Sequence, residues 1–210
     1  MTSSSATVSR SAAPFALDAA WVVVGSLLLG GLTSVAQGML PDSLRSLANS
    51  PSGWTLLTVV TIAARRPRLG AAAVLGAVSF VCLVLGYTFV SELRGMSYSP
   101  AFWGAVGLVA GPAVGWATSA ALDPRPLLSA VGSSLIAGVA VTDAVYGLTV
   151  VADTTSPVYW SIAGVAGVVF VVLVAWRRHL AWRYVALQVA LTLLWVGIGT
   201  AGFAVLNGGA

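Results

Sequence analysis

Seven long apolar runs, separated by short polar breaks, leave almost none of the 210 residues for a water-soluble domain. A helix that crosses the bilayer core needs about 20 mostly apolar residues. The mean hydropathy of +0.95 and the hydrophobic share of 58% are typical of an integral membrane protein. We therefore expect an all-α bundle of about seven transmembrane segments, at roughly 15–38, 52–65, 69–91, 101–121, 126–151, 158–176 and 183–206.

The chain divides into a short tail and one membrane domain. Residues 1–14, "MTSSSATVSRSAAP", predict a disordered N-terminal tail, because the apolar run after them is too long for a cleavable signal. Residues 15–210 then form a single transmembrane domain. The second segment is too short to span alone, so it begins earlier or follows a re-entrant piece within 41–54. Such broken helix is tolerated at membrane depth only beside protein or a water-filled cavity.

The positions of the arginines, which are the only basic residues, predict the topology. With seven segments, eight of the ten share the side of the N-terminus, and only Arg45 and Arg94 lie opposite. This positive-inside asymmetry predicts a cytoplasmic N-terminus in the inner membrane, and six segments would split the arginine-rich loops. Topology also explains the net charge of +4 without a nucleic-acid partner. The eight are Arg10, Arg65, Arg66, Arg68, Arg125, Arg177, Arg178 and Arg183.

The sequence lacks the residues for a disulfide framework or for a cysteine- or histidine-based metal site. Cys82 is the only cysteine, and His179 is the only histidine. There is no phosphate-binding glycine loop and no familiar hydrolase or kinase motif. No cofactor is therefore expected, apart from Mg²⁺ if the substrate is a diphosphate. The lipid bilayer is a certain partner, and the sequence leaves both a monomer and a homo-oligomer open.

Asp143 is the one acid in the middle of an apolar segment, within "VAVTDAVYGLTVV". The helical rise places it roughly 12 Å inside the outer boundary, so it should face the bundle interior. Tyr146 shares its face at i+3 and could bond to it or line the same cavity. Burial favours the protonated form, which has a proton to give. The alternative is a neutral acid that merely bonds to a neighbouring helix.

Polar and aromatic side chains approach the same outer end from several segments. Glu92 and Arg94 leave the third segment there, either as an interfacial anchor or as part of a site. A pocket of aromatics with a few polar groups above an acid is the usual form of a ligand site, although tryptophans also face lipid. Aromatic faces stabilise cations. The candidate catalytic residues are Asp143, Tyr146 and Glu92, and the candidate substrate-binding residues are Gln37, Arg45, Asn49, Trp54, Tyr87, Arg94, Trp103 and Trp116.

Three stretches carry a family resemblance: "LTSVAQGMLPDSLRSLANSPSGW", "LGYTFVSELRG" and "FWGAVGLVAGPAVGWA". Through them the chain resembles, over nearly its whole length, a family of short and largely uncharacterised bacterial multi-pass membrane proteins. In size, hydropathy and polar inventory it is also similar to the small membrane-bound terpene cyclases of drimentine- and xiamycin-type pathways. That resemblance implies cyclisation of a farnesyl chain, as the diphosphate or on an acceptor, to a drimane-type bicycle. The aspartate-rich motifs of soluble terpene synthases are absent.

The cyclase expectation assigns Asp143 as the general acid for the terminal double bond, tuned by Tyr146, with aromatics shielding the cations. A polar cap at Arg45, Asn49 and Arg94 is expected to hold the head group. The rival cap is the cytoplasmic cluster of Arg65, Arg66, Arg177 and Arg178. Two other functions stay open: a small-molecule-binding component of a transporter, and a structural membrane protein in which Asp143 only joins helices.

Overall fold

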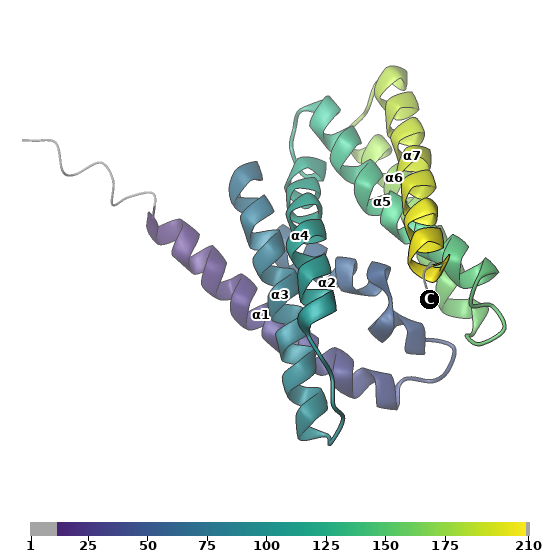
Figure 1. Ribbon diagram of the computed structural model, residues 1–210. Helices are drawn as coiled ribbons and strands as arrows, with labels where there is room; N and C mark the ends of the chain where they lie inside the picture. The colour runs from purple at the N-terminus through teal and green to yellow at the C-terminus, as the bar shows by residue number, and fades with distance from the viewer. Residues whose placement is uncertain (1–11, 209–210) are drawn as a thin grey trace, which may run out of the picture.

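Seven α-helices and one short 3-10 helix make up the computed structural model, which describes residues 12–208 (Figure 1). They are α1 (Ala12–Met39), η1 (Arg45–Asn49), α2 (Pro51–Ala63), α3 (Leu69–Leu93), α4 (Ala101–Ala121), α5 (Pro126–Thr149), α6 (Pro157–Arg177) and α7 (Trp182–Gly208). That part of the chain contains no strand, and six helices are long and apolar enough to cross a membrane. The all-α, multi-pass prediction is confirmed. Of the predicted tail, residues 1–11 lie outside the described residues.

The second helix is the exception in length, and its start explains why. Ser50 caps α2, because its hydroxyl accepts the N–H of Gly53 at 3.1 Å, and Pro51 occupies the first helical position. The 13 residues of α2 rise about 20 Å, whereas the bilayer core is about 30 Å thick. Helix α2 is therefore too short to span the bilayer by itself, and the short helix η1 precedes it.

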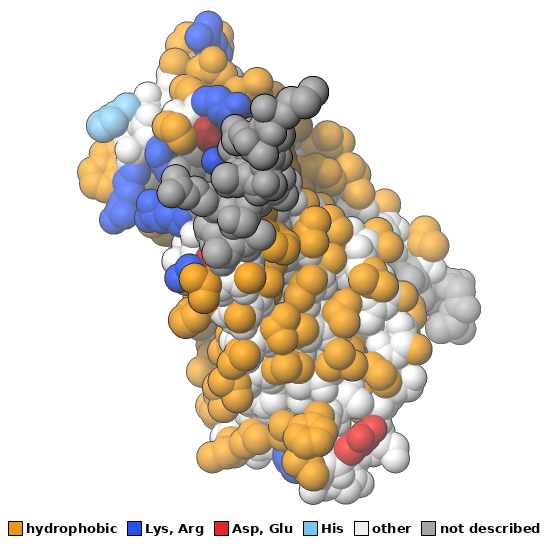
Figure 2. All heavy atoms as spheres, turned by 90° about the vertical axis from the view of Figure 1, so that its left-hand side faces the viewer, with side chains coloured by type: hydrophobic (Ala, Val, Ile, Leu, Met, Phe, Trp, Pro, Cys, Tyr) orange, Lys and Arg blue, Asp and Glu red, His pale blue; other side chains and the backbone are white. Residues whose placement is uncertain are grey.

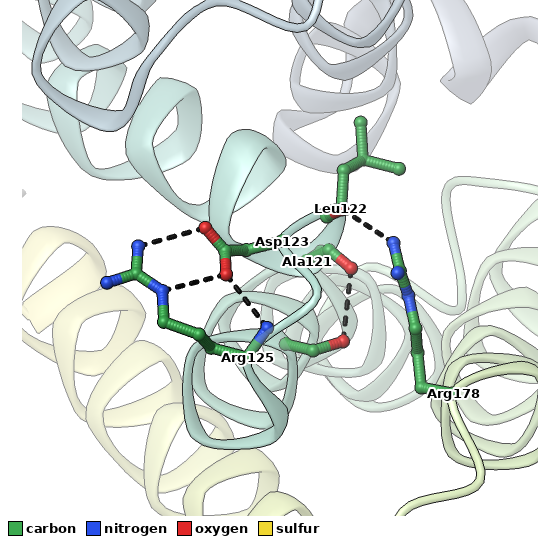
Figure 3. A network of polar contacts seen from close by, with 6 residues as sticks. Ala121, Leu122, Asp123, Arg125 and Arg178 are labelled. Carbon is green, nitrogen blue, oxygen red and sulfur yellow. Dashed lines mark hydrogen bonds and ion pairs between the residues drawn. The ribbon is translucent and has the colours of Figure 1, made fainter.

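One end of the bundle gathers the arginine-rich turns. Arg65, after α2, donates to Asp18 near the start of α1 at 2.8 Å. Arg178, after α6, donates to the carbonyl of Leu122, after α4, at 2.6 Å (Figure 3). These contacts bring together the turns that seven segments would place on one side. Figure 2 shows most of the visible cationic side chains at one end, above a face covered by apolar side chains.

The helices form two groups, with α2 between them. Helix α3 packs on both α1 and α4, α5 packs on both α6 and α7, and α4 against α5 joins the groups (Figure 1). Glycines allow the closest approach: Gly76 of α3 lies against the backbones of Gly111 and Gly115 in α4. Helix α2 contacts α1, α3, α4 and α5. Its first turn is therefore held inside the bundle.

Candidate functional site

The N-terminus of α2 meets the buried carboxyl of Asp143. The backbone N–H of Ser52 donates to Asp143 Oδ2 at 2.9 Å, and the Ser52 hydroxyl donates to the same oxygen. The first N–H groups of a helix have no partner within it and carry partial positive charge, so a carboxyl is stabilised there. Asp143 is only 1% exposed. The acid thus caps a helix that begins inside the bundle.

A chain of hydroxyl groups extends from Asp143 toward α6. The Tyr159 hydroxyl lies 2.7 Å from the hydroxyl of Ser52 and 2.7 Å from that of Ser50. All three side chains are buried. Asp143, Ser52, Tyr159 and Ser50 therefore form one hydrogen-bonded network built from three helices. Such a network can move a proton to or from the acid without water.

The two oxygens of the Asp143 carboxyl differ. Oδ2 accepts both bonds from Ser52, whereas Oδ1 is buried and has no hydrogen-bond partner among the described residues. Oδ1 is therefore the oxygen that is left open to a proton or to a bound molecule. The other buried side-chain atoms without a partner in the described chain are Thr142 Oγ1, Gln188 Oε1 and Trp195 Nε1, all on α5 or α7.

Two apolar hollows flank the first turn of α2. The first, which we call the α2–α6 groove, has a volume of about 350 Å³ and lies between α2, α5 and α6. The second, the aromatic pocket, has a volume of about 220 Å³ and lies between α2, α3, α4 and α5. Ser52 and Tyr159 line the groove, and Ser50 lines the aromatic pocket. Thr55 and Val139 line both, and Val139 lies one helical turn before Asp143.

Several candidate binding residues meet at the aromatic pocket. Asn49, Trp54 and Trp103 line it, together with Phe80 and Tyr98. Among the residues that the structure describes, no charged side chain lines either hollow. Burial, with a smaller effect from Tyr87, raises the pKa of the Tyr98 phenol, so this ring is neutral at physiological pH.

Gln37 and Tyr87 hold the broken segment in place behind this pocket. The Tyr87 hydroxyl donates to Gln37 Oε1 at 2.8 Å, and Gln37 Nε2 donates to the carbonyl of Ala48 at 3.2 Å. The indole N–H of Trp54 donates to the same carbonyl at 3.3 Å. These bonds satisfy backbone that has left the helical pattern inside the bundle. Gln37 and Tyr87 therefore support the pocket without lining it.

The pairing of Tyr146 with Asp143 is not found. The Tyr146 ring stacks on Phe203 of α7, with centroids 4.2 Å apart, and makes no hydrogen bond to the acid. The partner of Asp143 is Ser52, and the tyrosine of the network is Tyr159. A shared helix face at i+3 did not decide the contact, because the broken segment approaches the acid from another direction.

The remaining candidates lie away from the two hollows. Arg45 is exposed and pairs with Asp42 at 2.7 Å. Arg94 donates to the backbone carbonyl of Ser34 and, at 3.2 Å, to its hydroxyl. Glu92 is exposed in a shallow hollow, and Trp116 lines neither the groove nor the aromatic pocket. The geometry therefore does not gather these four side chains around Asp143.

Sequence reasoning missed Ser52 and Tyr159, and it did not connect Ser50 with the acid. The signal for the serines was "NSPSGW", a helix-capping serine followed by proline at the first helical position. Nothing in the sequence pointed to Tyr159, because its place beside Ser52 depends on how α6 packs. The described residues contain no group of three or more His, Cys, Asp or Glu side chains that could hold a metal ion.

The other acid with a clear electrostatic setting is Asp123, in the turn before α5. Its carboxyl accepts from the Arg125 guanidinium and backbone N–H at 2.9 Å (Figure 3). These bonds lower the pKa of Asp123 from 3.8 to about 2. Asp123 is therefore a turn residue whose bonds to Arg125 order the arginine-rich end.

Comparison with known proteins gives a family and no activity. A family model described as "Family of unknown function (DUF6518)" matches residues 9–209, which is nearly the whole chain. No curated protein and no solved structure matches. The family match and the six long apolar helices agree with the expected multi-pass membrane family.

Proposed function

We propose that this chain, which belongs to the Family of unknown function (DUF6518), is a membrane-bound terpene cyclase. The reaction is a protonation-initiated cyclisation of a farnesyl chain, as farnesyl diphosphate or on an acceptor, to a drimane-type bicycle. The observation that carries this proposal is Asp143: a buried acid with one oxygen that has no partner among the described residues, held by Ser52, which lines an apolar hollow.

In the first step, Asp143 gives the proton on Oδ1 to the distal alkene. A C–H bond forms, the π bond breaks, and a tertiary carbocation remains on the substrate. The carboxylate that is left keeps the two donors of Ser52, which stabilise its negative charge. The same two donors hold the carboxyl in place before the reaction.

The later steps need shielding and a base. Each internal alkene attacks the preceding cation, so two rings close without loss of atoms. Trp54, Trp103 and Phe80 line the aromatic pocket and can stabilise cations through their ring faces. The final cation loses a proton, which returns to the carboxylate directly or through Ser52 and Tyr159. The net reaction is an isomerisation that leaves a diphosphate head group intact.

The experiment is incubation of membranes that contain the protein with farnesyl diphosphate, followed by hydrolysis of the phosphate esters and product analysis by mass spectrometry. A bicyclic alcohol is expected with the wild-type chain and is expected to be absent with Asp143→Asn. The variant must still purify as a folded protein in detergent. Full activity of Asp143→Asn would remove the acid from the mechanism.

A second candidate function rests on the break before α2. Transporters bind substrates at half-helix ends near the membrane midplane, and α2 is a short helix whose N-terminus lies inside the bundle. In a substrate-binding transport component, Asp143 would respond to protons or to an anionic ligand. Uptake of a small molecule by cells, without any product from farnesyl diphosphate, would favour this function.

The third candidate is a structural role, and it predicts a different experimental result. If Asp143 only joins α5 to α2, then Asp143→Asn lowers thermal stability and no ligand or product is found. Parallel measurement of melting temperature and product in the same preparations distinguishes the two cases.

A further inference from the structure

We infer that the substrate head group binds at the arginine-rich end of the bundle, at Arg66 and Arg177. The chain then lies in the α2–α6 groove with its distal alkene at Asp143. This inference rests on the proposed cyclase function and names the position and chemistry of its head-group site: a diphosphate or comparable anion.

The groove runs from the hydroxyl network that holds the acid, where Ser52 and Tyr159 line it, toward that end. On α6 its lining residues extend from Tyr159, in the hydroxyl network, to Phe170, eleven residues or about 16 Å further along the helix. Arg177 follows Phe170 by seven residues, which is close to two full turns, so it lies on the same face of α6. The lining residues of α6 therefore lead from the hydroxyl network beside Asp143 toward Arg177.

The lining residues of α2 also lead toward an arginine. On α2 the lining residues extend from Ser52 to Val59, and Arg66 follows in the turn after the helix, with a φ of 49°. Arg66 and Arg177 are exposed, and neither forms an ion pair within the described part of the chain. Their neighbours are occupied, because Arg65 pairs with Asp18 and Arg178 binds the Leu122 carbonyl. Of the four arginines in the cytoplasmic cluster, Arg66 and Arg177 are therefore the two that are available to bind a head group.

Chain length argues against a head group at the outer end. The alkene that is protonated is the one farthest from the head group, and an extended farnesyl chain is about 15 Å long at ordinary C–C bond lengths. Asp143 is only six residues, or about 9 Å, from the outer end of α5 at Thr149. A head group at the outer arginines would therefore lie near the acid, with no room for the extended chain between them. Arg45 and Arg94 are also engaged, with Asp42 and Ser34.

The rim of the groove suits entry of a prenyl chain from the bilayer. Leu56 on α2 and Ile162 on α6 line it and are each about half exposed, at 51% and 53%. A chain dissolved in lipid can therefore slide in sideways while its charged head group stays at the membrane surface.

The test measures binding as well as turnover. The full chain is placed in nanodiscs of phosphatidylcholine, which carries no net charge and so does not compete for the arginines. Binding of radiolabelled farnesyl diphosphate is compared with binding of farnesol, and empty nanodiscs supply the background. The variants are Arg66→Gln and Arg177→Gln, with Arg183→Gln as the matched control, because Arg183 is at the same end but on α7, which does not line the groove.

We expect Arg66→Gln and Arg177→Gln each to weaken binding of farnesyl diphosphate by about tenfold, as for loss of one charged hydrogen bond. Farnesol binding should change by less than about twofold, and Arg183→Gln should bind both ligands like the wild type, since neither loses such a bond. Unchanged farnesyl diphosphate binding in both variants, or a loss that appears instead in Arg45→Gln, would overturn the inference.

The outcomes separate this inference from the proposed function. Weaker diphosphate binding without any cyclic product would support the head-group site and contradict the cyclase. Cyclic product with unchanged binding in Arg66→Gln and Arg177→Gln would support the cyclase and contradict the head-group site. Absence of saturable farnesyl diphosphate binding to the wild-type chain would contradict the head-group site.

Discussion

Ser52 donates both its backbone N–H and its hydroxyl to one oxygen of Asp143, a residue 91 positions later in the chain. The bond joins the first turn of a short helix to the middle of a long one. It gives a hydrogen-bond partner to a backbone N–H at the start of α2 and to one oxygen of a buried carboxyl at the same time. The other oxygen, Oδ1, has no hydrogen-bond partner among the described residues, and the proposed chemistry depends on that oxygen.

Replacement of Ser52 by alanine should lower both stability and activity. The variant keeps the backbone N–H bond but loses the hydroxyl bonds to Asp143 and Tyr159, at a cost of about 1–3 kcal/mol in the free energy of unfolding. Product formation should fall because the carboxylate loses one of its two donors. Thermal unfolding in detergent and the farnesyl diphosphate assay measure the two effects. Ser161→Ala is the control, since Ser161 lies on an exposed part of α6, and an equal effect there would contradict the prediction.

Removal of the Tyr159 hydroxyl should have a larger effect than removal of the Tyr146 hydroxyl. Tyr159→Phe leaves Ser50 and Ser52 without their shared partner and should cost about 1 kcal/mol of stability, with slower product formation. Tyr146→Phe keeps the ring that stacks on Phe203, so the melting temperature should stay close to that of the wild type. The reverse order of the two melting temperatures would favour the i+3 pairing expected from the sequence.

A methyl group at Gly76 should separate α3 from α4. A Cβ atom there would overlap the carbonyl of Gly111 and lie 2.8 Å from the Cα of Gly115. Gly76→Ala should therefore destabilise the protein by about 1–3 kcal/mol, which is measured as a lower melting temperature in detergent. Gly104→Ala is the matched control, because no atom lies within 4 Å of a Cβ at that position of α4. A lower melting temperature of the control alone would contradict the packing.

The turn at Asp123 should contribute stability that depends on pH. Its pKa in the folded chain is lowered from 3.8 to about 2 by the bonds from Arg125, so the carboxylate stabilises the fold above the unfolded pKa. That contribution is lost as the pH falls through about 2. Thermal unfolding measured from about pH 5 down to about pH 2 should show a steeper loss in the wild type than in Asp123→Asn. Parallel curves would show that the turn does not contribute to stability.

Several features of the fold could be predicted from local patterns. Long apolar runs had to become helices, because only internally bonded backbone is stable in lipid, and each predicted segment overlaps a helix of the structure. The arginine distribution required the turns near Arg65 and Arg178 to share an end with the N-terminus of α1, and their contacts with Asp18 and Leu122 agree. The short second segment indicated broken helix at membrane depth.

The composition of the site was only partly predictable. Hydropathy was sufficient to single out Asp143, because an acid in the middle of an apolar helix is costly and must have a reason. Asn49, Trp54 and Trp103 meet at the aromatic pocket because their segments end on the same side. Arg45 and Arg94 share that end as well, but nearby groups engage their guanidinium groups.

The sequence by itself determined that this chain crosses the membrane as a helical bundle and carries one buried acid. Both follow from the free energy of placing each residue in lipid or water, which is a local property. Only the tertiary structure decided that Ser52 and Tyr159, and not Tyr146, surround that acid. Which side chain faces which depends on the rotation and depth of helices α2, α5 and α6 relative to one another. Packing between residues far apart in the sequence sets those quantities, and no local pattern records them.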